Sequence, residues 1–194
     1  MNELSGRKAI SHERIVDVAS RAVRRQGYHG VNVTEVMREA KLTHGGFYAH
    51  FASRDALLSE AVTRAGADIA GVLRGQIERW GAVGASPFRA VVETYLSMAH
   101  VRDCDNGCPV SLLTGEMARQ APEVLAPSRR LIEELHRLVK DILPASVPPD
   151  AAWTVTSAML GAVQLARALV DGDSGAAGAI LADTRSNLLA RYDT

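Results

Sequence analysis

Cysteine is scarce in this sequence, with two residues in 194, which is too few for the disulfide framework of a secreted protein. No apolar run reaches the about 18 residues that a membrane-spanning helix needs. Arg7 and Lys8 near the start are not followed by the apolar core of a signal peptide. We therefore expect a soluble, cytoplasmic protein without a membrane partner.

The sequence also lacks the patterns of an enzyme. Outside a weak Cys/His group, His100, Cys104 and Cys108, the sequence has no nucleophile with its base, pair of carboxylates, phosphate-binding loop or metal-ligand cluster. We therefore predict no catalytic residue, no cofactor and no metal. Strand-like alternation and internal repeats are absent as well. Apolar residues, which with 47% of the chain suffice for a core, recur instead at helical spacing, and this predicts an all-α protein.

The chain has no net charge, but its charges are unevenly distributed. Residues 1–55 contain nine Lys and Arg against six Asp and Glu, a balance of +3, and residues 56–194 have a balance of −3. The basic N-terminal segment suits an anionic partner such as nucleic acid, although solvated helix faces explain a charge of this size equally well.

Residues 34–58 have the pattern of two short helices, a tight turn and the start of a longer helix, which is a helix-turn-helix arrangement. We expect Thr34 to cap the first helix and Thr43 the second. In the second helix Phe47 and Phe51 face the core, four residues apart. Its other face carries hydrogen-bonding side chains and two glycines, which allow close approach of a partner: Thr43, His44, Gly45, Gly46, Tyr48 and His50.

This segment resembles the DNA-binding domain of TetR-type transcriptional repressors. The family pattern is Tyr-x-His-Phe, a small polar residue, a basic residue, an acidic residue and Leu, and it is matched by Tyr48–Phe51, Ser53–Asp55 and Leu57. Arg54 stands where Lys is more usual and keeps the charge. Upstream positions also fit: Ile15, Ala19, Gln26, Gly27, Tyr28, Val33 and Thr34. The resemblance covers about the first third of the chain.

The resemblance implies two domains. Residues 1–52 would form an N-terminal three-helix helix-turn-helix domain that binds double-stranded DNA, and residues 53–194 a C-terminal helical domain for effector binding and dimerisation. Thr43 and His44 would contact base edges, with Gly45 allowing close approach. Phosphate contacts would come from Thr34, Tyr48, His50 and Arg54. Capping alone for Thr34 and Thr43, and a core position for His50, stay open as alternatives.

Beyond the motif, the periodicity and the capping signals predict six further helices. They run from Ser53 to about Gly81, from Ser86 through Met98, from Pro109, from Pro122, and as a final pair over 150–170 and 174–191. The final pair is rich in Ala and Gly, which lets helices approach closely. It would form either a hairpin within the monomer or, as the resemblance implies, the four-helix interface of a homodimer that reads a palindromic operator.

In the family, a small-molecule effector enters a cavity among the C-terminal helices and moves the recognition helices apart. Candidate wall residues are mostly apolar, and core packing explains each of them as well. They are Trp80, Tyr95, Met98, Leu112, Leu113, Met117, Trp153, Met159 and Gln164.

His100, Cys104 and Cys108 are spaced four residues apart, with a turn signal at Asn106-Gly107 and a helix start at Pro109. Three interpretations stay open: inert thiols, a soft-metal site, or a redox or electrophile sensor in which Cys108 reacts and Cys104 resolves the product. Some TetR-type regulators sense electrophiles through a Gly-Cys segment in this region, and Gly107-Cys108 is similar.

The sequence thus predicts a ligand-responsive regulator, most simply a repressor released from its operator by a small molecule or an electrophile. A helical ligand-binding module without a DNA function is the alternative. Activation of transcription instead of repression stays open as a second alternative.

Overall fold

The computed structural model describes residues 3–193, and every regular element within these bounds is a helix. The all-α class is confirmed. None of these described helices is both long and apolar enough to span a membrane. The helices are α1 (Glu3–Gly30), α2 (Val33–Glu39), the 3-10 helix η1 (His44–Ala49), α3 (Arg54–Gly81), α4 (Pro87–Tyr95), α5 (Met98–Arg102), α6 (Pro109–Met117), α7 (Pro122–Ile142), α8 (Ala151–Leu169) and α9 (Ser174–Tyr192).

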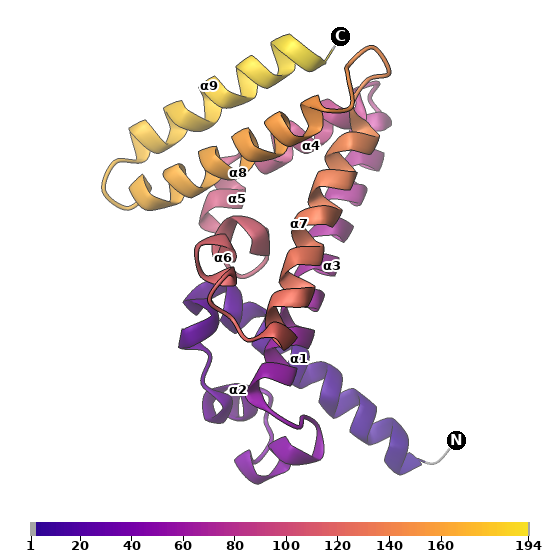
Figure 1. The fold of residues 1–194 in the computed structure, drawn as a ribbon, viewed down its shortest axis with the longest axis vertical. Coiled ribbons are helices and arrows are strands. Elements are labelled where there is room, and N and C mark those ends of the chain that lie inside the picture. The colour runs from indigo at the N-terminus through magenta and orange to yellow at the C-terminus, as the bar shows by residue number, and fades with distance from the viewer. Residues whose placement is uncertain (1–2, 194) are drawn as a thin grey trace.

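The helices form an elongated molecule with two different ends (Figure 1). At one end, α1 packs beside α2, η1 and the first turns of α3. From there α3 and α7 run side by side towards the other end, where α8 and α9 form an antiparallel pair. The long helix α3 therefore connects the N-terminal motif to the C-terminal helices.

Polar caps and prolines determine where most helices begin. The hydroxyl of Ser53 accepts a hydrogen bond from the Ala56 N–H at 2.9 Å and starts α3, and Pro109 and Pro122 occupy the first turns of α6 and α7. The expected cap at Thr34 is wrong. The cap of α2 is Asn32, whose side-chain oxygen accepts from the Thr34 N–H at 2.8 Å, so Thr34 lies inside the helix.

The helix expected from Ser86 through Met98 is interrupted. It ends at Tyr95, and Ser97 then caps the separate short helix α5 by accepting from the His100 N–H at 3.2 Å. The same hydroxyl donates to the Thr94 carbonyl, a competing local hydrogen bond of the kind that lets serine break a helix.

A second interruption lies within α1, at Gly27, whose backbone has φ 72° and ψ 176°. This region of conformational space is essentially restricted to glycine. The break turns the end of α1 so that Tyr28 is fully buried in the interior.

The buried apolar residues form one connected cluster that extends from Ile15 in α1 to Tyr192 in α9. The helix-turn-helix motif therefore shares a core with the C-terminal helices, because the buried face of α3 packs against both α1 and α7. A domain boundary between residues 52 and 53 stays a prediction.

Candidate nucleic-acid interface and interior pocket

The candidate recognition segment is η1, a single 3-10 helix where the sequence predicted an ordinary helix. Thr43 holds the N-cap position with an extended backbone, but its side chain makes no capping hydrogen bond, so the capping role expected for it is wrong. As predicted, Phe47 and Phe51 are buried, with ring centroids 5.6 Å apart. This pair anchors η1 to the core.

The other face of η1 is open to solvent. Thr43, His44 and Gly45 are exposed, and the Tyr48 side chain is 73% exposed. A Cβ placed on Gly45 would meet no atom within 4 Å. The Thr34 hydroxyl lies 3.2 Å from Nδ1 of His44, which ties α2 to the start of η1. Five of the seven predicted DNA contacts thus lie together on one accessible surface, although their roles stay predictions.

His50 is half-buried beside the ring of Phe51 and 6.0 Å from the ring of His12. Its Nδ1 is inaccessible to solvent and has no hydrogen-bond partner among the described residues. Desolvation, and then the positive charges of His12 and Lys8, lower the pKa of His50 below its usual value. A lowered pKa favours the neutral ring, which has one N–H group that can donate to a phosphate.

Arg54 points back into the protein. Its guanidinium donates to the backbone carbonyls of Tyr28 and Val31, so part of its hydrogen-bonding capacity serves to hold the end of α1 against α3. Arg7 and Lys8 lie within α1.

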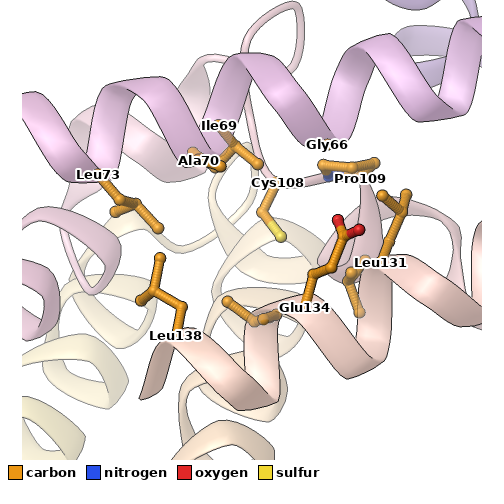
Figure 2. Close-up of a pocket in the computed structure, with 11 residues that line it drawn as sticks. Gly66, Ile69, Ala70, Leu73, Cys108, Pro109, Leu131, Glu134 and Leu138 are labelled. Carbon is orange, nitrogen blue, oxygen red and sulfur yellow. The ribbon is translucent and has the colours of Figure 1, made fainter. Parts of the chain in front are cut away.

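A small cavity of about 50 Å³ lies between α3 and α7. Figure 2 shows Leu73 and Leu138 facing each other across it, with the sulfur of Cys108 pointing into the space and the Glu134 carboxylate at its edge. Drug-sized ligands generally occupy about 300–1,000 Å³. A ligand of that size would have to push α3 and α7 apart.

None of the nine predicted wall residues lines this cavity. The structure distributes them among the core, the half-buried layer and the surface. Tyr95, Leu113, Met117 and Met159 are buried, Trp80, Met98 and Leu112 are half-buried, and Trp153 and Gln164 are exposed. The prediction selected large residues, whereas the lining of the cavity includes two small residues of α3, Gly66 and Ala70. Two small residues spaced four apart lie on the same face of a helix, and this pattern was the sequence signal for the cavity that the prediction missed.

Cys108 occupies the N-cap of α6 and is 1% exposed, whereas Cys104 is half-buried in the preceding loop. The Cys108 N–H donates to Nε2 of His100 at 3.0 Å, and Nδ1 of His100 donates to the Tyr95 carbonyl at 2.7 Å. Burial lowers the pKa of His100 to about 4, so the ring is neutral at pH 7.

Both ring nitrogens of His100 are engaged, which leaves no lone pair for a soft metal. No group of three or more metal-ligating side chains occurs in the described part of the chain.

The guanidinium of Arg167 on α8 holds this loop in place. It donates to the carbonyls of His100 and Val101 and to the hydroxyl of Ser111. Residues from α5, α6 and α8 thus form one polar network directly behind the thiol that enters the cavity.

The α8–α9 pair packs as an antiparallel hairpin within the protomer (Figure 1). It nevertheless exposes large apolar side chains, with Leu165 58% and Trp153 50% exposed. A Cβ placed on Gly161 of α8 or Gly178 of α9 would meet no atom within 4 Å. The pair therefore exposes apolar side chains of α8 and has a glycine in each helix where a further helix could approach closely.

Comparison with known proteins gives a consistent result. Residues 15–61 match the family model described as bacterial regulatory proteins, tetR family. A TetR transcriptional regulator from Chloroflexus aurantiacus J-10-FL is similar in structure, with a TM-score of 0.75 at 16% identity over 96% of this chain and 98% of that chain. The regulatory protein TetR from Rhodobacter sphaeroides has a TM-score of 0.73 at 18% identity, over 94% and 99%.

The reduced form of E. coli NemR is also similar, with a TM-score of 0.69 at 16% identity over 91% of this chain and 95% of that chain. No curated protein is similar to the chain in sequence. At these identities the solved structures show a common fold.

Proposed function

We propose, from the premise that the chain belongs to the TetR family of bacterial regulatory proteins, that it is a homodimeric, ligand-responsive repressor of transcription that binds a palindromic operator. The observation that supports this most directly is the exposed polar face of η1. Phe47 and Phe51 fix this short helix to the core, while Thr43, His44 and Tyr48 are exposed to solvent.

In this proposal Thr43 and His44 contact base edges, and Tyr48 and the His50 N–H contact phosphates. Phosphate contacts contribute to binding any duplex, whereas base contacts distinguish sequences. Arg54 acts mainly by fixing the end of α1 to α3, because two of its N–H groups already bind carbonyls.

The test begins with a duplex selected by the protein from a randomised library. Tyr48→Ala should weaken binding to the selected duplex and to an unrelated duplex by similar factors. Thr43→Ala should instead reduce the free-energy difference between the preferred base and the other bases at one position of the site, by about 1–3 kcal/mol. Thr63→Ala, on an exposed turn of α3, is the control and should bind like the parent. If Tyr48→Ala binds both duplexes as tightly as the parent does, Tyr48 does not contact the phosphates.

Release from DNA would begin at the cavity between α3 and α7. A ligand can shift the conformational equilibrium only if it binds one state more tightly, and a cavity of about 50 Å³ must widen to accept more than a very small molecule. Widening would tilt α3, whose first turn adjoins η1.

Ala70→Leu should fill the space. Small apolar compounds that release DNA from the parent should then fail to release it from this variant, while its affinity for DNA stays unchanged.

A second candidate trigger is an electrophile or oxidant that reacts at Cys108. It is favoured by the sulfur that points into the cavity and by the position of the thiol at the N-cap of α6. Attack of the thiolate on peroxide would give a sulfenic acid and release hydroxide, and the Cys104 thiol would displace water to form a disulfide.

Peroxide should therefore release DNA from the parent, and thiol reductant should restore binding, whereas Cys108→Ser should not respond. If Cys108→Ser responds as the parent does, or if Cys108 of the folded protein resists alkylation, the thiols are structural and the effector binds the cavity reversibly.

A further inference from the structure

Tyr28 is held by three other helices at once. Its backbone N–H donates to the Glu116 carboxylate on α6 at 3.0 Å, and its carbonyl accepts from Arg54 on α3. Its hydroxyl lies 2.7 Å from that of Ser128 on α7. The Tyr28 side chain is fully buried. A residue at the end of α1, beside the helix-turn-helix motif, is therefore connected to the C-terminal helices through every polar group that it has.

The contact with Glu116 depends on the break in α1. In an uninterrupted helix the Tyr28 N–H would bond to the carbonyl four residues earlier, but the φ of 72° at Gly27 turns it away. The carboxylate occupies the space of the missing side chain, because a Cβ placed on Gly27 would lie 2.3 Å from an Oε atom of Glu116. The glycine at position 27 therefore does two things: it permits the positive φ that turns the Tyr28 N–H towards Glu116, and it leaves room for the carboxylate that accepts this bond. An N–H···carboxylate bond is also stronger than one between neutral groups.

The two ends of α6 have different neighbours. Cys108 and Pro109 at its start line the cavity between α3 and α7. Glu116 at its end binds the Tyr28 N–H, at a distance along the helix on the order of 10 Å at about 1.5 Å per residue. A short helix moves as a rigid unit, so a shift of its first turn when the cavity widens also moves the carboxylate.

From these contacts we infer that Glu116 is the positioning residue that couples the cavity to the DNA-binding face, by holding the Tyr28 N–H when α6 is in place and releasing it when α6 moves. This inference rests on the proposed function. Arg54 and Ser128 keep Tyr28 in place when the carboxylate is withdrawn, so the protein stays folded in both states. Because coupling between sites is reciprocal, DNA binding must also be detectable at α6.

The test uses the full-length protein and a duplex selected from a randomised library, and needs no knowledge of the effector. Amide hydrogen exchange over residues 109–117 is measured with and without the duplex. In the parent the duplex should change exchange there by about 5-fold to 150-fold, the usual range of coupling between sites. In Glu116→Ala the change should fall below about twofold, although the variant still binds the duplex.

Two matched variants separate coupling from simple capping. Glu116→Gln keeps a carbonyl acceptor of the same reach and should preserve the parent's change in exchange. Glu133→Ala removes an exposed carboxylate from α7 and should also behave like the parent. If Glu116→Ala does not fold, as judged by circular dichroism, Glu116→Asp replaces it. This variant keeps the charge but is shorter by one methylene, so it should lose the coupling.

Three results would overturn the inference. If folded Glu116→Ala or Glu116→Asp shows the parent's full change in exchange, the carboxylate only caps the backbone. If the parent binds its duplex without any change over residues 109–117, DNA binding stands but α6 is not coupled to it. If the parent selects no duplex, the proposed function itself fails, and the coupling fails with it.

Discussion

Single residues in this protein are constrained by backbone geometry and by buried polar contacts more than by size. Gly27 combines a conformation that other residues avoid with a carboxylate in the place of its side chain. Arg24 on the preceding turn is 3% exposed and binds Asp68 of α3 at 3.0 Å. The end of α1 is therefore positioned by polar groups that tolerate few substitutions.

Gly27→Ala should lower the free energy of unfolding by about 1–3 kcal/mol through backbone strain, with a further loss from displacing Glu116. Gly71→Ala is the matched control, because Gly71 is exposed in α3 and a Cβ there would meet no atom within 4 Å. That substitution should raise stability by up to about 1 kcal/mol. Urea unfolding of both variants measures the difference, and two losses of equal size would show that the break at Gly27 carries no special constraint.

His100 should make stability depend on pH. Its pKa falls from 6.5 to about 4 on burial, so the unfolded chain takes up the proton first as the pH decreases. The stabilisation from the neutral ring is complete above pH 6.5 and is lost as the pH falls towards 4, by about 1.4 kcal/mol per pH unit. His100→Gln should unfold with a flatter pH profile over this interval. Parallel profiles for parent and variant in urea titrations would contradict the assignment.

At the scale of helices, the sequence was sufficient wherever a cap or proline coincided with apolar periodicity. The starts of α3, α6 and α7 follow from Ser53, Pro109 and Pro122. It was insufficient where two local hydrogen bonds compete. Asn32 and Thr34 are both good capping residues two positions apart, and in the structure Asn32 is the cap.

The two candidate caps of α2 can be separated by mutation. Asn32→Ala removes the acceptor for two backbone N–H groups and should destabilise the protein by about 0.5–2 kcal/mol. Thr34→Ala removes an exposed hydroxyl that only contacts His44, so its effect should stay within about 0.5 kcal/mol. Thermal unfolding of both variants gives the comparison. A larger loss for Thr34→Ala would mean that the cap inferred from the sequence is the effective one in solution.

At the scale of the whole molecule, the interior pocket was the feature that sequence reasoning could not locate. The pattern of α3 gives its buried face, but not that α7 lies against Gly66 and Ala70. A cavity forms where two helices that are far apart in the sequence pack together, and the periodicity of one helix does not show which other helix packs against it. The core positions of Phe47 and Phe51 were predictable, by contrast, because neighbours within one short motif determine them.

The apolar surface of α8 and α9 leads to the last prediction. One η1 segment covers only half of a palindromic site, so tight operator binding in the proposed function requires two protomers. Gly161 borders empty space in the protomer, and Trp at this position should leave the monomer folded while blocking close approach of a second copy. Sedimentation should show dimers for the parent and monomers for Gly161→Trp, with tight binding to the selected palindrome lost.

The control for this substitution is Gly75→Trp, at an exposed position of α3 that also has no atom within 4 Å of a Cβ. It adds the same bulky side chain outside the α8–α9 surface and should leave both dimerisation and DNA binding unchanged. If Gly161→Trp stays dimeric while Gly75→Trp dissociates, the protomers meet through α3 instead. A monomeric parent that binds the palindrome tightly would exclude dimerisation as the basis of operator recognition, because a single η1 would then be sufficient.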